Sequence, residues 1–184
     1  MAECRSLSAT HMIKPRETQN RALRYALAAH LASPGCPLRA AREGAMPTLA
    51  DVAAMLKQQP YAVVSTIRPS GTVQSTLVNV GLYADGVGFT TVGQSRKEHN
   101  LKRNPACTVT IHHGPYWITV EGKARLYTWH NTDPETLRRL LREIYVAAGG
   151  THDDWDTYDR VMRQERRAAV VVVPERIYVR RPRS

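Results

Sequence analysis

The chain has 184 residues, 42% of them hydrophobic and 23% charged, and its 26 basic and 16 acidic residues give a formal net charge of +10. This length and composition indicate a folded globular domain, and the longest unbroken apolar run, residues 168–173, is far shorter than the ~20 residues of a membrane-spanning helix. Three cysteines, at positions 4, 36 and 107, are too few for a disulfide framework or a zinc module, so we expect a reducing, cytoplasmic location.

Residues 1–45 differ in character from the rest of the chain. They combine basic residues and turn formers without a clear hydrophobic stripe, and they lack the apolar core of a secretory signal. We expect a disordered extension, or a start codon placed too early, followed by one folded domain over residues 46–184. Met46 stands directly before the first strong structural signal, which fits a later start.

That signal is a helix start, and from there the chain alternates strands with turns. Thr48 is the expected N-cap, Asp51 occupies the capping-box position, and Pro60 ends this first helix. Further helices are predicted over residues 94–104, from residues 132–135 to Gly149, and over residues 152–167. Strands are predicted at residues 61–68, 72–83, 87–92, 106–113, 116–129, 168–173 and 177–179.

Six or seven short strands with helices inserted late predict a mainly β (α+β) fold. Regular turn punctuation favours an antiparallel sheet closed into a small barrel, with the helices packed outside. The helix that begins near residue 134 carries an apolar stripe, which belongs either to the core or to an interface. Its members are Leu137, Leu140, Leu141, Ile144 and Tyr145.

The motifs of common hydrolases, metalloenzymes and dinucleotide-binding proteins are absent from the sequence. It contains no G-x-S-x-G, no H-E-x-x-H and no strand-to-helix G-x-G-x-x-G. His112 and His113 are adjacent in a predicted strand, so they would point to opposite faces, one inward and one into solvent. No metal site is expected.

The most informative stretch is residues 89–105, where a strand ends, Gly93 turns the chain, and a helix begins at Ser95-Arg96-Lys97. Free backbone N–H groups and the positive end of the helix dipole meet there. With a hydroxyl, a guanidinium and an ammonium added, this turn suits a phosphate dianion. The alternative is that the cations only solvate an exposed helix face.

This stretch resembles the pyridoxamine 5′-phosphate oxidase-like split β-barrels, which are antiparallel Greek-key barrels that bind flavins or the deazaflavin F420. Phe89-Thr90-Thr91 and Ser95-Arg96-Lys97 look like the family's strand end and phosphate turn. The resemblance covers residues 48–179 in order, but Val73 replaces the usual proline and Arg180-Arg181 replaces a glycine-aromatic pair. Further matching segments are residues 70–76, 100–101, 104–105, 117–124, 152–158, 166–167 and 173–179, the last three resembling an actinobacterial F420-binding branch.

The resemblance implies a set of cofactor contacts. Phosphate would be bound by Arg96 and Lys97 with help from Ser95, while Thr90 and Thr91 would touch the ribityl chain. Lys102 and Arg103 would suit the acidic tail of F420. The remaining implied cofactor-binding residues are Ser75, Thr76, Leu77 and Val78 under the ring, Asn100 in the helix, and Trp117 in the pocket wall.

The implied function is an F420-binding oxidoreductase that uses F420H2 to reduce a small organic substrate. The alternatives are an FMN-dependent oxidase or reductase of the same fold, and a cofactor carrier or sensor without turnover. Family members are usually homodimers with cofactor sites between protomers. Nucleic acid is not an expected partner, because residues 94–104 hold no aromatic side chain for base stacking, and no membrane partner is expected either.

Overall fold

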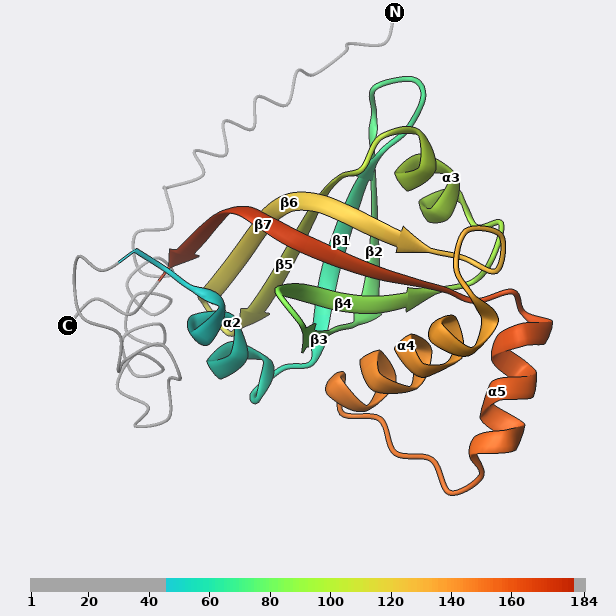
Figure 1. The fold of residues 1–184 in the computed structure, drawn as a ribbon. Coiled ribbons are helices and arrows are strands. Elements are labelled where there is room, and N and C mark those ends of the chain that lie inside the picture. Colours follow the sequence, from blue (N-terminus) through green and yellow to red (C-terminus); the bar gives the residue numbers. More distant parts are fainter. Residues whose placement is uncertain (1–45, 181–184) are drawn as a thin grey trace, which may run out of the picture. The chain divides into compact units, whose positions relative to one another are not determined.

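The computed structural model describes residues 46–180, so the expectations for residues 1–45 lie outside the described part of the chain. Within that part, seven strands form one antiparallel sheet in the order β2-β1-β5-β6-β7-β4-β3 (Figure 1). The strands are β1 Tyr61–Ile67, β2 Val73–Asn79, β3 Gly81–Tyr83, β4 Gly86–Thr91, β5 Ala106–His113, β6 Tyr116–Tyr127 and β7 Ala168–Arg180. The helices are α2 Leu49–Leu56, α3 Arg96–Arg103, α4 Pro134–Ala147 and α5 Trp155–Gln164.

The sheet curls because its two edge strands are neighbours in sequence. Only Val80 separates β2 from β3, yet these strands lie at opposite edges of the sheet. Val80 is fully buried, and its N–H donates to the carbonyl oxygen of Pro60 at 2.8 Å. Strand β2 contacts β4 without pairing with it, so the barrel stays split along this line. The expected antiparallel split β-barrel with peripheral helices is therefore confirmed.

The prediction of one strand over residues 72–83 is wrong, because the chain changes partners in its middle. Strand β2 pairs with β1, whereas β3 pairs with β4. Gly81 marks the change: a Cβ built there would lie 2.2 Å from the backbone carbonyl carbon of Ala147. Only glycine lets the strand pass this close to the end of α4.

The opposite correction applies at the C-terminal end of the sheet. The sequence predicted two strands, at 168–173 and 177–179, whereas β7 runs unbroken from Ala168 to Arg180. Pro174 sits where the register with β6 shifts between Glu121 and Gly122. Proline has no N–H to donate to the neighbouring strand, and a bulge is a place where the hydrogen-bond ladder is already interrupted. The strand therefore continues through Pro174, although proline usually ends a strand.

Local capping signals place the starts of α2 and α4 as predicted. The Thr48 side chain caps α2 in a full capping box with Asp51, and Asp133 caps α4 with Pro134 directly after it. Helix α5 is shorter than predicted, because Asp154 caps it. No helix within residues 46–180 has the length and apolar character to cross a membrane.

The core has two parts, one inside the curled sheet and one between the outside of the sheet and helices α4 and α5. Inside the curled sheet, Val64, Val109 and Val120 pair across β1, β5 and β6 and are fully buried. The apolar stripe of α4 packs outside the sheet against β7 and α5, so it belongs to the core rather than to an interface. The buried members of this second cluster are Leu137, Leu140, Leu141, Ile144, Tyr158, Ala169 and Val171.

The outer face of β2, β1, β5 and β6 keeps large apolar side chains exposed. Cross-strand pairing places Leu77, Val63, Thr110 and Thr119 in one row on this face. Its exposed large hydrophobic residues are Tyr61, Val73, Leu77 and Trp117, and Tyr178 of β7 continues the row beyond Thr119.

Candidate functional site

The turn between β4 and α3, residues 92–95, is fixed by contact with the segment that follows α5. A Cβ built on Gly93 would lie 2.3 Å from the carbonyl oxygen of Arg166. The Gly93 N–H donates to the carbonyl oxygen of Glu165 at 3.2 Å, and Gln94 adopts a left-handed φ of 59°. This packing gives the helix that follows a defined starting point.

Some backbone N–H groups at the N-terminus of α3 have acceptors within the described part of the chain, and others have none there. The Ser95 hydroxyl accepts from the N–H of Glu98 at 3.3 Å and is hydrogen-bonded to the Thr91 hydroxyl at 3.1 Å. The Glu98 carboxylate accepts from the Gln94 N–H and from the Lys102 ammonium. The N–H groups of Arg96 and Lys97 have no acceptor within residues 46–180, so they can donate to an anion at the positive helix end.

Arg96 and Lys97 present two different kinds of unpaired positive charge. Arg96 is exposed and forms no ion pair with the described residues. Lys97 is only 7% exposed, and its Nζ lies 5.3 Å from the centre of the Phe89 ring. Burial lowers the pKa of Lys97, and burial raises the pKa of the neighbouring Cys107 thiol to about 12. Since no carboxylate pairs with Lys97 in the described part of the chain, its charge is uncompensated.

Asn100, expected to contact the cofactor, ties α3 to the sheet. It is 4% exposed, and its Nδ2 donates to Thr66 Oγ1 and to Gln74 Oε1, both at 3.0 Å. Both donor hydrogens of the amide are thus used within the protein. Its place in the family motif therefore has a structural explanation here.

The four residues expected under the cofactor ring divide between two faces of β2. Ser75 and Leu77 lie on the outer face, and the Ser75 hydroxyl is hydrogen-bonded to that of Ser65 at 2.8 Å. Thr76 and Val78 alternate with them and point towards the interior. Because consecutive strand residues face opposite ways, the four side chains cannot all lie under one ring.

Val78 and Thr90 line a cavity of about 350 Å³, the lateral cavity, between the barrel and the α4–α5 pair. Tyr145, Tyr158 and Arg167 form part of its far wall. The family resemblance predicted Val78 and Thr90 as cofactor contacts. No local sequence signal identified the residues of α4, α5 and the segment after α5 that line the other side of this cavity.

Trp117 lies apart from the other predicted residues within one chain. It begins β6 on the outer face, is 36% exposed, and pairs with His112 and Arg180. The row of Leu77 crosses β1 and β5 before it reaches β6, which is three strand spacings of about 4.8 Å. The structure thus brings together Thr91, Ser95, Arg96, Lys97 and Asn100, but not Trp117.

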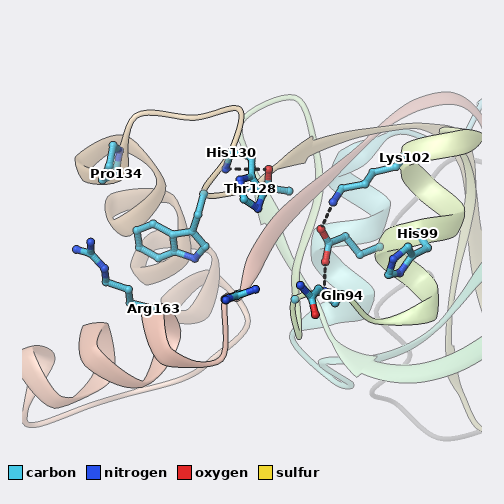
Figure 2. Close-up of a pocket in the computed structure, with 11 residues that line it drawn as sticks. Gln94, His99, Lys102, Thr128, His130, Pro134 and Arg163 are labelled. Atoms are coloured by element: carbon cyan, nitrogen blue, oxygen red, sulfur yellow. Dashed lines mark hydrogen bonds and ion pairs between the residues drawn. The ribbon is translucent and has the colours of Figure 1, made fainter.

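A larger cavity of about 680 Å³, the basic cavity, opens on the other side of the β4–α3 turn (Figure 2). Figure 2 shows His99 and Lys102 of α3 on one side and Arg163 of α5 on the other. Of the two residues expected to suit an acidic tail, Lys102 lines this cavity but is paired with Glu98 at 2.6 Å. Arg103 does not line it and instead donates to the Ile67 carbonyl oxygen at 2.8 Å. The full lining is Gly93, Gln94, Glu98, His99, Lys102, Thr128, Trp129, His130, Pro134, Arg163 and Arg166.

The histidine pair does not behave as predicted. Both His112 and His113 are exposed, because they lie at the end of β5 next to the exposed turn at Gly114. Neither points into the core, so the expectation of one inward histidine is wrong. Among residues 46–180, no three histidine, cysteine, aspartate or glutamate side chains are grouped to hold a metal ion.

Comparison with known proteins gives a family and a fold. The sequence profile of the pyridoxamine 5′-phosphate oxidase family matches residues 49–181. A conserved hypothetical protein from Mycobacterium tuberculosis is similar in structure, with a TM-score of 0.60, 21% identity, and coverage of 77% of this chain and 89% of that one. An F420 reductase is similar at TM-score 0.53 and 19% identity, covering 75% of this chain and 98% of its own.

The haem storage protein HutZ from Vibrio cholerae is also similar, at TM-score 0.50 and 11% identity, covering 73% of this chain and 95% of its own. No curated protein sequence matches the chain. At these identities the likeness to solved structures establishes the fold.

Proposed function

This chain belongs to the pyridoxamine 5′-phosphate oxidase family, and from that membership we propose that it is an F420-binding oxidoreductase. In this proposal F420H2 supplies a hydride to a small organic substrate. The family includes oxidoreductases, and an F420 reductase shares the fold.

The observation that carries the proposal is the uncompensated charge at the start of α3. Lys97 is buried without an acidic partner among the described residues, and beside it Arg96 is unpaired and two backbone N–H groups lack acceptors. A buried charge is costly unless it is paired. An anionic phosphate group would compensate this charge and accept charge-assisted hydrogen bonds from these groups. The residues present therefore fit the phosphate that FMN and F420 share.

In this proposal the chain binds and positions, while the bound cofactor supplies the redox chemistry. Arg96, Lys97 and the backbone at Ser95 would hold the phosphate, and Thr90, in the wall of the lateral cavity, would adjoin the ribityl chain. The lateral cavity, which Thr90 lines, would then hold the substrate, with Arg167 as its cation.

We also propose that the chain forms a homodimer through the outer face of β2, β1, β5 and β6. Exposed Leu77, Tyr61 and Trp117 on that face suit burial against a second copy. Trp117 could reach a cofactor site only from such a copy, since it lies three strands from β2 in its own chain. Sedimentation that shows only monomer at micromolar concentrations would contradict the dimer.

Titration of the purified protein with F420 and with FMN, followed by tryptophan fluorescence, tests cofactor choice. We expect tighter binding of F420, and at least tenfold weaker binding by Arg96→Ala. Arg139→Ala is the matched control, because it removes an exposed arginine from α4, away from the turn. Equal affinities of the Arg96→Ala variant and the wild type would reject the phosphate role of Arg96.

The outcomes separate the alternative functions. Preference for FMN would make the protein an FMN oxidase or reductase. Tight F420 binding with oxidation of F420H2 by reducible substrates would support the reductase. Tight binding without turnover would favour a carrier, a role compatible with the fold because the haem storage protein shares it. Failure to bind either cofactor would remove the redox proposal and leave the family and the fold.

A further inference from the structure

We propose that the basic cavity binds an organic anion rich in carboxylate or phosphate oxygens, at a site separate from the groups of the β4–α3 turn that would bind the cofactor phosphate. Such binding would use Arg163, Arg166 and Trp129, none of which belongs to the proposed cofactor contacts. It requires no redox cofactor in the protein.

The charges that line the cavity do not balance. Its one carboxylate, Glu98, already accepts from the Lys102 ammonium and from the Gln94 N–H. Arg163 and Arg166 line the same cavity, and neither has an acidic partner in the part of the chain that the structure describes. Two guanidinium groups therefore lack the counter-charge that a bidentate anion would supply.

The tryptophan in the cavity wall adds a third unused donor. The indole Nε1 of Trp129 is buried and has no hydrogen-bond partner within residues 46–180. A buried donor left unpaired costs about 1–3 kcal/mol. The Arg163 guanidinium lies over this ring, 5.7 Å from its centre, and the Arg163 side chain is otherwise exposed. An anion bound in this cavity by Arg163 and Arg166 would supply the acceptor that Nε1 lacks among the described residues.

The cavity is built by three segments that hydrogen bonds hold in place. The Gly93 N–H donates to the carbonyl oxygen of Glu165 at 3.2 Å, which docks the end of α5 on the β4–α3 turn. Asn131 Oδ1 accepts from the Thr128 N–H at 2.7 Å and so fixes the turn before α4. The resulting space of about 680 Å³ is in the range of small-molecule sites. It suits a tricarboxylate, a phosphorylated metabolite, or an anionic extension of a bound cofactor.

The test uses Trp129 as its own reporter. The chain has three tryptophans, so Trp117→Phe with Trp155→Phe leaves only Trp129. Citrate and inorganic phosphate are titrated into this cofactor-free protein at constant ionic strength, and calorimetry on the unsubstituted protein gives an independent affinity for citrate. We expect saturable citrate binding that changes the Trp129 emission.

Matched arginine variants decide whether the cavity is the site. Arg163→Ala with Arg166→Ala should weaken citrate binding at least tenfold while leaving the thermal unfolding midpoint unchanged. Arg160→Ala removes an exposed arginine from the same helix, outside this cavity, and should leave binding unchanged. Wild-type citrate affinity in the double variant, an equal loss in Arg160→Ala, or no saturable binding would overturn the proposal.

Two further arms locate the anion and identify its source. Arg96→Ala should keep citrate binding; its loss there would place the anion at the β4–α3 turn and overturn the proposal. If saturating F420 blocks citrate and FMN does not, the site holds the anionic extension of the cofactor. If neither blocks it, the site holds a free metabolite, and both results support an anion site. Because citrate is titrated without cofactor, failure of the redox proposal would leave these outcomes readable.

Discussion

Replacement of Asn100 by alanine tests whether this residue holds α3 on the sheet. Its buried amide donates to Thr66 Oγ1 and Gln74 Oε1, both at 3.0 Å, and Thr66 is itself 1% exposed. Each bond contributes about 0.5–1.5 kcal/mol net, and the buried Thr66 hydroxyl would lose its partner. We therefore expect Asn100→Ala to lower the free energy of unfolding by about 2–3 kcal/mol.

Urea unfolding of the cofactor-free protein measures this loss. With a slope of about 2 kcal/mol per molar urea, the midpoint should fall by roughly 1 M. Thr66→Val removes the other end of one bond, so the double-mutant cycle with Asn100→Ala should show a coupling of about 1 kcal/mol. Asn79→Ala, at an exposed position of β2, is the control and should cost less than about 0.5 kcal/mol.

A stability loss below about 0.5 kcal/mol for Asn100→Ala, or an additive cycle with Thr66→Val, would refute the structural role of the amide. Unchanged stability combined with weaker cofactor binding would return Asn100 to the cofactor site.

Three further predictions concern buried positions. Lys97→Met should stabilise the cofactor-free protein at neutral pH. Because the pKa of Lys97 is lowered in the folded state, this gain should shrink as the pH rises towards the ordinary value of 10.5; a gain that grows with pH would contradict the reasoning. Gly81→Ala should cost about 3 kcal/mol or more in urea unfolding, since its Cβ would lie 2.2 Å from Ala147, whereas Gly114→Ala meets open space and should cost only about 1 kcal/mol for its left-handed backbone. In a variant whose two other cysteines are serine, Cys107 should react with a thiol reagent only on unfolding, because burial raises its pKa to about 12; fast reaction in the native state would show that it is accessible.

The sequence predicted the elements whose ends are set by local contacts. Thr48 with Asp51, Asp133 with Pro134, and Ser95 each cap a helix within one turn of their own position. Capping bonds join residues two or three apart, so the chain reveals them without knowledge of the fold. The turn residues between the short strands are local signals as well, and they predicted the antiparallel barrel.

Errors in the strand predictions arose where pairing partners decide. Residues 72–83 read as one strand, yet Val80 divides β2 from β3 because the curled sheet gives each a different neighbour. Pro174 reads as a strand end, yet a bulge in β7, where Glu175 has no partner on β6, lets the strand continue through it. A strand is defined by its partner, and the partner lies far away in the chain.

In the candidate site, too, the sequence predicted the local features and the tertiary structure decided the rest. By itself the sequence pointed to the turn at Ser95-Arg96-Lys97, because a strand end, a glycine and a capped helix are local features. Only the tertiary structure decided that Lys97 is buried, that Asn100 serves the fold, and that β2 divides its side chains between two faces. Likewise only the fold assembled the basic cavity, from residues 93–102, 128–134 and 163–166. Local sequence fixes backbone conformation over a few residues, whereas burial and charge pairing depend on which distant segments come into contact.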